Sequence, residues 1–260
     1  MMLPRPMKDI APTMCRIAGI RLPSGCEGTA IEPVVEEIGR PSSLCLLVID
    51  SLGMALWKRL EAAAPHLTSM ASRGLVVLEA EPPPTTAVNL ATMATGVQAS
   101  SHRVKKKEDP LLAETIFDVM QKCALKTALA SQREGVLAAL FTGKTTWQWC
   151  PSSLRDEAVL ELVLKEMKAR RPDFLWMHFV EVDRAAHRHG PESPECEEAL
   201  ASTDRLLGEL TAGLAAFSCA LLVAADHGHH GVPEGAQKGI HDGSDPHDMA
   251  VPLVWRKAPT

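Results

Sequence analysis

The sequence of 260 residues contains no tyrosine, and only 4% of its residues are aromatic. No other feature of the sequence explains the absence of tyrosine. Its seven cysteines include no pair with CxxC spacing. An odd and unpatterned set of cysteines argues against a disulfide framework and is typical of a reducing compartment.

The chain also lacks a long apolar run and an excess of basic residues. No stretch reaches the ~18 apolar residues of a membrane span, and the N-terminus shows no basic region followed by an apolar segment. The formal net charge of -5 and the pI of about 6.1 do not support binding to a nucleic acid polymer. We therefore expect a cytoplasmic protein that binds neither membranes nor nucleic acids, and its oligomeric state stays open.

The chain is long enough for one large domain with a sizeable core. Residues 1–42 mix proline, glycine and charge without clear periodicity, so we interpret them as an irregular N-terminal lead-in. Residues 43–260 are predicted to form a single domain.

Short apolar segments alternate with helical patterns over this domain. The predicted strands cover residues 44–49, 75–78, 127–130, 174–180, 220–224 and 251–255. The predicted helices cover about 54–73, 86–95, 110–122, 154–170 and 195–216. Such alternation predicts an α/β fold with a mostly parallel central sheet and helices on both faces.

Three carboxylates stand at or just past the ends of predicted strands, namely Asp50, Asp183 and Asp226. In parallel sheets, ligands bind beyond the carboxyl ends of the strands, so these side chains are expected to converge on one rim. Seven of the ten histidines lie between His187 and His247, close to two of these aspartates. Aspartate and neutral imidazole are ligands for zinc or manganese.

The segment EPPPTTAVNLATMATG predicts a site for an anion. Three prolines hold the approach extended, and Thr85 or Thr86 stands where a helix N-cap is expected. The exposed N–H groups and the positive end of the helix dipole would lie beside that hydroxyl. Gly96 is suited to the C-cap.

Together, these motifs resemble the alkaline phosphatase superfamily, and most closely its type I phosphodiesterase/nucleotide pyrophosphatase branch. The resemblance extends in chain order from Leu44 to about Trp255 and implies an alkaline-phosphatase-like three-layer sandwich. The matching residues are Asp50 in LLVIDSLG, Thr86 and Asn89 in TTAVNLATMATG, Asp183 and His187 in DRAAHRHG, Asp226 and His227 in ADHG, and His241 in GIHDGSDP.

The resemblance implies two divalent metal ions, with zinc as the first choice and manganese as the alternative. One set of ligands would be Asp183, His187 and His241, and the other Asp50, Asp226, His227 and the Thr86 oxygen. Thr86 would be the nucleophile that forms a phosphothreonine, with the Asn89 amide holding a non-bridging oxygen. The implied substrate is a small-molecule phosphate ester, most simply a phosphodiester or nucleotide pyrophosphate.

Several alternatives remain at this point. His247 competes with His241, because related mutases place a metal histidine shortly before a similar VPL strand. His189, His229 and His230 are expected outside the ligand set, and His178 in the core.

The function also has rivals. One is a phosphomonoesterase or phosphomutase on the same core, which cationic groups near the phosphate would favour; Arg184, Arg188 and the Lys105–Lys107 run are candidates. That run is usually a solvated loop, which is the reading we favour, and attraction of an anionic substrate is the alternative. The other rival is an inactive scaffold that binds metal or phosphate.

Overall fold

The computed structural model describes residues 3–233 and 235–259. Its strands are β1 (Arg5–Pro6), β2 (Ser43–Ile49), β3 (Leu75–Glu79), β4 (Thr127–Ala130), β5 (Trp147–Trp149), β6 (Phe174–Phe179), β7 (Cys219–Ala224), β8 (His230–Gly231), β9 (Gly239–Ile240) and β10 (Ala250–Arg256). Its α-helices are α1 (Ile10–Ala18), α2 (Glu32–Ile38), α3 (Met54–Arg59), α4 (Pro65–Ala71), α5 (Thr86–Thr95), α6 (Ala99–His102), α7 (Ile116–Lys122), α8 (Val136–Leu140), α9 (Asp156–Arg170), α10 (Glu181–His189) and α11 (Pro194–Ala215). Short 3₁₀ turns are η1 (Met7–Asp9), η2 (Glu61–Ala63) and η3 (Pro246–Asp248).

Eight strands form one sheet in the order β1-β3-β10-β7-β2-β6-β4-β5. Only β10 pairs antiparallel to its neighbours, β3 and β7; the other pairings are parallel. The carboxyl ends of β2, β3, β6 and β7 consequently lie at the same edge. β8 and β9 form a separate antiparallel pair.

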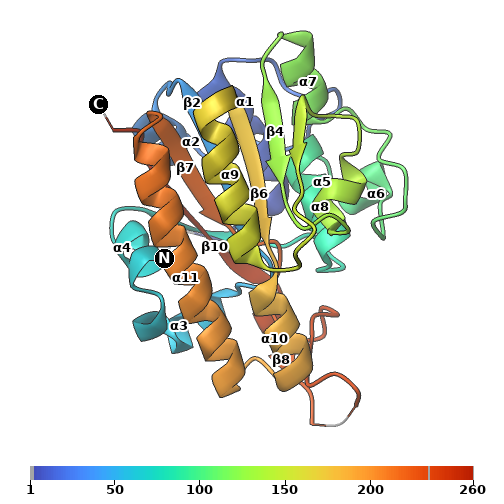
Figure 1. Cartoon of the computed structure of the whole chain (residues 1–260). Helices are drawn as coiled ribbons and strands as arrows, with labels where there is room; N and C mark the ends of the chain where they lie inside the picture. The colour runs from blue at the N-terminus through green and yellow to red at the C-terminus, as the bar shows by residue number, and fades with distance from the viewer. Residues whose placement is uncertain (1–2, 234, 260) are drawn as a thin grey trace.

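Helices cover both faces of this sheet, as predicted. α9 and α11 lie across one face, and α1 and α5 lie behind it (Figure 1). The central strands β2, β6 and β7 are buried along their whole length, which explains their nearly continuous apolar sequences. Among the described residues, none of the helices combines the length and the apolar character of a membrane-spanning segment.

The six predicted strands are all present, as β2, β3, β4, β6, β7 and β10. The predicted helices over 86–95, 154–170 and 195–216 are also present, as α5, α9 and α11. The shorter elements β1, β5, α6, α8 and α10 were not predicted.

Two predicted helices had the wrong bounds. The segment 54–73 is divided into α3 and α4, because α3 ends at Arg59 and Pro65 starts a new helix, where its missing N–H costs nothing. The helix predicted over 110–122 begins only at Ile116. Thr115 caps it by accepting from the Asp118 N–H, and the Asp118 carboxylate accepts from the Thr115 N–H in return.

The prediction of an irregular lead-in for residues 1–42 was wrong about the local structure. This segment forms α1 and α2 and adds β1 beside β3. Apolar side chains spaced like Ile10, Met14 and Ile17 give α1 a buried face in the main core. Pro12 does not break the helix, because it lies in the first turn, where N–H groups have no helical partner.

Candidate metal centre and nucleophile

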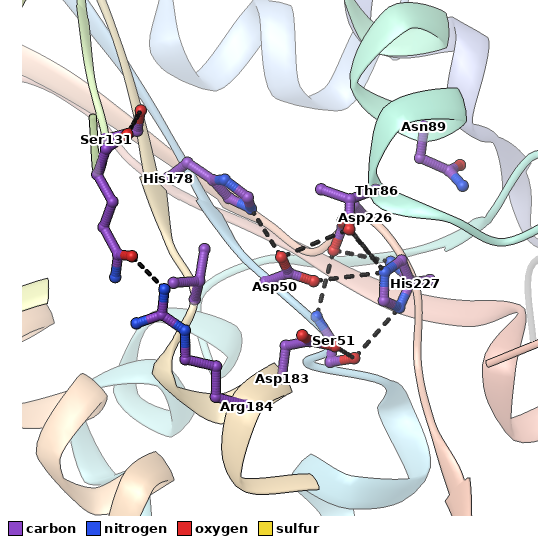
Figure 2. A network of polar contacts seen from close by, with 12 residues as sticks. Asp50, Ser51, Thr86, Asn89, Ser131, His178, Asp183, Arg184, Asp226 and His227 are labelled. Atoms are coloured by element: carbon purple, nitrogen blue, oxygen red, sulfur yellow. Dashed lines mark hydrogen bonds and ion pairs between the residues drawn. The ribbon is translucent and has the colours of Figure 1, made fainter. Parts of the chain in front are cut away.

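Polar side chains from four parts of the chain meet at the carboxyl edge of the sheet (Figure 2). Asp50 directly follows β2, Asp183 lies in the first turn of α10 after β6, and Asp226 follows β7. Thr86 is the first residue of α5. The convergence predicted for the three aspartates is therefore present in the structure.

The first group of ligand atoms, here called the imidazole cluster, comprises Asp183, His187, His229 and His241. One ligand atom from each of these four side chains lies within 4.8 Å of the others. Asp183 Oδ1 is 3.3 Å from His187 Nε2, 3.8 Å from His241 Nε2 and 3.7 Å from His229 Nδ1. This is a donor set suited to zinc.

Backbone carbonyls orient two of these rings. His187 Nδ1 lies 2.9 Å from the Gly239 carbonyl, and His241 Nδ1 lies 2.8 Å from the Pro84 carbonyl. A carbonyl only accepts, so each Nδ1 must carry the proton, and each Nε2 then presents its lone pair. The two Nε2 atoms lie 3.1 Å apart and face the same point. Such outer contacts commonly fix metal-binding histidines.

The second group, here called the carboxylate cluster, comprises Asp50, Asp226 and His227. His227 Nε2 is 3.3 Å from Asp50 Oδ1 and 3.4 Å from Asp226 Oδ2. Asp226 and His227 are fully buried, and Asp50 is 4% exposed. His178 from β6 adds a ring nitrogen, Nε2, 3.2 Å from Asp50 Oδ2.

Thr86 borders the carboxylate cluster. Its Oγ1 lies 3.2 Å from His227 Nε2 and 3.5 Å from Asp50 Oδ2. Thr85 is the N-cap residue, and Thr86, the threonine that the motif alignment selected, is the one whose hydroxyl borders the cluster. The hydroxyl therefore stands beside the N–H groups at the start of α5, where an anion would be stabilised.

Burial gives these side chains unusual acidities. It raises the pKa of Asp50 well above its usual range, and repulsion from Asp226 and Asp183 adds to the effect. Burial also lowers the pKa of His229 to about 2, with a further contribution from His241, and lowers the pKa of His178 to about 4. Neutral imidazoles are the form that binds metals.

The residues present fit divalent cations. Asp50 Oδ1 and Asp226 Oδ2 are buried and accept no hydrogen bond from any described residue. Leaving a buried carboxylate oxygen without a donor is costly, and a bound cation would remove that cost. The structure thus brings together all the sequence-predicted metal ligands, Asp50, Thr86, Asp183, His187, Asp226, His227 and His241.

Asn89 does not reach the site. Its Oδ1 accepts from the Glu81 N–H at 2.7 Å, and its Nδ2 donates to the carbonyls of Glu81 and Thr85. The side chain is fully buried and lies apart from the cluster around Thr86 (Figure 2). The predicted role of Asn89 in holding a phosphate oxygen is therefore not supported by this geometry. The residue instead ties the approach segment to α5.

His241 and His247, the two alternatives for one metal ligand, lie in different surroundings. His241 lies in the imidazole cluster, whereas the side chain of His247 is 63% exposed and pairs with Asp245. His230 also lies outside both clusters, where its Nδ1 is 2.8 Å from Asp248.

Sequence reasoning missed His229 and Ser51. Ser51 adopts a left-handed backbone conformation with φ of 65°, and its Oγ lies 2.5 Å from His229 Nδ1 and 3.0 Å from Asp183 Oδ1. The same hydroxyl lies 3.2 Å from His227 Nδ1 and so connects the two clusters. A strained non-glycine residue next to a strand end is a signal of a functional site, but it is visible only in the structure.

A close approach of backbones shapes the loop that carries His227 and His229. The Gly228 N–H donates to the Asp248 carbonyl at 2.8 Å. A Cβ atom at Gly228 would lie 2.0 Å from the His247 carbonyl oxygen. Glycine is therefore required between the two histidines, and it lets each imidazole turn to a different cluster.

Comparisons with known proteins agree with this arrangement. The chain is 27% identical over 223 residues to venom phosphodiesterase 2 of Crotalus adamanteus, which covers 72% of this chain and 27% of the venom protein. The chain thus spans about a quarter of that relative's length.

Two solved structures share the fold. One is an inactive variant of murine ectonucleotide pyrophosphatase/phosphodiesterase 5 in complex with AMP, with a TM-score of 0.63, 18% identity, and coverage of 74% of this chain and 59% of that chain. The other is the C-terminal periplasmic domain of EcEptC from Escherichia coli in complex with Zn. Its TM-score is 0.59 and its identity 17%, and the match covers 84% of this chain and 73% of that chain.

The model of the family described as type I phosphodiesterase/nucleotide pyrophosphatase matches residues 44–149 and 145–255. These two segments contain every side chain of both clusters and Thr86. The chain belongs to the type I phosphodiesterase/nucleotide pyrophosphatase family.

Proposed function

We propose that the chain is a two-metal phosphoester hydrolase that acts on phosphodiesters or nucleotide pyrophosphates through Thr86. The observation that carries this proposal is the position of the Thr86 hydroxyl, at the start of α5 and 3.2 Å from His227 Nε2. A hydroxyl beside a candidate metal cluster and beside free helix N–H groups is suited to attack an anionic phosphorus centre.

The residues of the chain have separate tasks in this proposal. Thr86 supplies the attacking oxygen, and the first N–H groups of α5 stabilise negative charge on the phosphoryl oxygens. The two clusters hold divalent cations, which, when bound, lower the pKa of a ligated hydroxyl and offset charge on the substrate. The attack would break one P–O bond of the diester or pyrophosphate, release that group as an alcohol or a phosphate, and leave the phosphoryl group with its remaining substituent on Thr86 as a phosphothreonine ester.

Zinc is the proposed metal, with manganese as the alternative. The ligands are imidazoles and carboxylates, which suit both ions. The related domain from Escherichia coli was solved with Zn, which supports the first choice. We further propose a cytoplasmic location, supported by seven cysteines, none of which forms a disulfide.

The direct test is hydrolysis of bis-para-nitrophenyl phosphate by protein reconstituted with zinc or manganese. Thr86→Ala should remove turnover, and rapid acid quenching of wild-type protein with the labelled diester should trap a para-nitrophenyl phosphoryl group on Thr86. Thr85→Val is the matched control, because the Thr85 hydroxyl makes no hydrogen bond to the described residues. Full activity in Thr86→Ala would overturn the assignment of the nucleophile.

A further inference from the structure

A cavity of about 340 Å³ opens beside the nucleophile. Its lining includes Asp50, Thr86 and Asp183 of the candidate site. Lys107, Gln132, Glu134 and Arg184 also line it, together with apolar residues such as Val136. The cavity therefore leads from the candidate metal centre to a wall with two cationic side chains.

Both cations are held by neutral oxygens. Arg184 donates through Nη1 to the Leu154 carbonyl at 2.7 Å and through Nη2 to the Gln132 side-chain oxygen. Lys107 donates to the Glu134 carbonyl at 3.0 Å. Within the part of the chain that the structure describes, neither cation has a carboxylate at ion-pair distance. Their charge is thus positioned but not neutralised.

The guanidinium of Arg184 is the better fixed of the two. Gln132 is 2% exposed, and its Nε2 donates to the Leu154 carbonyl at 2.7 Å. Arg184 and Gln132 therefore share one acceptor, and the buried amide gives the guanidinium a rigid support. Arg184 also follows Asp183 directly on α10, and both line this cavity, with the Arg184 side chain extending away from the cluster around Asp50 (Figure 2).

The cavity offers no platform for a nucleobase. Apart from the imidazole of His178, no aromatic ring is among its described lining residues. Stacking on an aromatic side chain contributes roughly 1–3 kcal/mol per base, so a nucleoside would gain little in this cavity. A small and charged substrate matches the wall better than a large and flat one.

We propose that Lys107 and Arg184 select small phosphate compounds that carry one negative charge more than a simple diester. This inference rests on the proposed function and names its substrate class. The extra charge has two chemical sources, which are the second ionised oxygen of a monoester and an anionic group attached beyond the reacting phosphorus. A diester phosphate carries a single charge, whereas a monoester with a second pKa of about 6 is mostly a dianion at neutral pH.

The kinetic test compares three probes: para-nitrophenyl phosphate, bis-para-nitrophenyl phosphate and inorganic pyrophosphate. Lys107→Ala and Arg184→Ala should each lower kcat/KM at least about 10-fold for a probe with the extra charge, since each loses a charge-assisted hydrogen bond. The kcat/KM for bis-para-nitrophenyl phosphate should change by about twofold or less. The probe that loses more, the monoester or pyrophosphate, identifies the source of the charge.

Two matched controls remove a positive charge near the cavity without altering its wall. Lys106→Ala acts one residue from Lys107, and Arg188→Ala acts one helical turn from Arg184; neither side chain lines the cavity. Both variants should keep wild-type rates on all three probes. Equal losses in the controls, or equal losses on the diester and the charged probes, would overturn the inference.

A binding measurement separates this inference from the proposed function. Calorimetric titration of the metal-loaded protein with inorganic phosphate and with dimethyl phosphate needs no turnover. If the wild-type protein hydrolyses none of the probes, the proposed function fails. The inference still holds in that case if the wild-type protein binds phosphate more tightly than dimethyl phosphate and if Lys107→Ala removes the difference in affinity. Indistinguishable binding in wild type and variant would overturn the inference even in an active enzyme.

Discussion

The two clusters of the candidate metal centre differ in burial and in charge. Asp226 and His227 of the carboxylate cluster are fully buried, whereas the side chains of Asp183 and His187 in the imidazole cluster are 18% and 25% exposed. Two carboxylates neutralise a dication, but the single carboxylate of the imidazole cluster leaves a positive charge. With a dication bound, the buried cluster would avoid net charge where desolvation is costly, and the open cluster would keep a positive charge that attracts an anion.

Removing a carboxylate from the buried cluster should have the largest effect. Asp226→Asn should weaken metal binding there by about 100-fold or more. The metal-free variant should nevertheless melt at a higher temperature than metal-free wild type, because repulsion on Asp50 is relieved. Metal analysis and calorimetry in chelator would check both effects, and a lower melting temperature of the metal-free variant would contradict the charge argument.

Removing an imidazole from the open cluster should have a smaller effect. His229→Ala should weaken metal binding about 10-fold, because three of the four side chains of that cluster remain. Cobalt-substituted protein should also show weaker visible absorption if the variant gains a water ligand. His247→Ala is the control, since that side chain points away from both clusters. An unchanged cobalt spectrum in His229→Ala would place His229 outside the ligand set.

The stability of the metal-free protein should depend on pH in opposite directions through the two clusters. The pKa of Asp50 is raised, so its ionisation favours the unfolded chain, and stability should fall as pH rises above ~4. The pKa values of His229 and His241 are lowered, so protonation favours the unfolded chain, and stability should fall as pH decreases below ~6.5. Denaturant titrations in chelator should therefore show a maximum between these limits. A monotonic profile would mean that one cluster dominates.

The smallest effect on catalysis is expected from a substitution of Asn89, which lies outside both clusters. Asn89→Ala leaves the half-buried N–H and carbonyl of Glu81 without their side-chain partner, while the Thr85 carbonyl keeps the backbone N–H of residue 89, so the free energy of unfolding should fall by about 1–3 kcal/mol. The kcat of the folded variant should stay within about twofold of wild type. A large loss of kcat without loss of stability would restore the catalytic role that the sequence predicted.

The central sheet could be predicted because buried parallel strands produce apolar runs that end at polar residues. LCLLVI before Asp50 and ALLVA before Asp226 are of this kind. Their position at strand ends also predicted the convergence of the three aspartates. In contrast, α1 was missed because prolines around its start obscured an apolar spacing that was present in the sequence.

The site could be predicted only as far as residue type and order specify it. The role of holding a phosphate oxygen was assigned to Asn89 from its place in a motif. Its amide instead bonds to the backbone of Glu81, and its position in the helix does not reveal that direction. His229 was set aside because the ligand sets were already filled, and only the turn at Gly228 brings its ring to the imidazole cluster. Lys107 and Arg184 lie far apart in sequence, so their common cavity depends on how the turn that carries Lys107 packs near α10.

The helix that carries Thr86 is held from behind by the first part of the chain. α1 packs on α5, and the N–H groups of Glu27 and Gly28 both donate to the Gly96 carbonyl at the end of α5. The region that resembles the family begins only at residue 44. The boundary of sequence similarity is therefore not a boundary of folding: a fragment trimmed to that region would contain every proposed ligand and still expose the apolar side of the helix that aims the nucleophile.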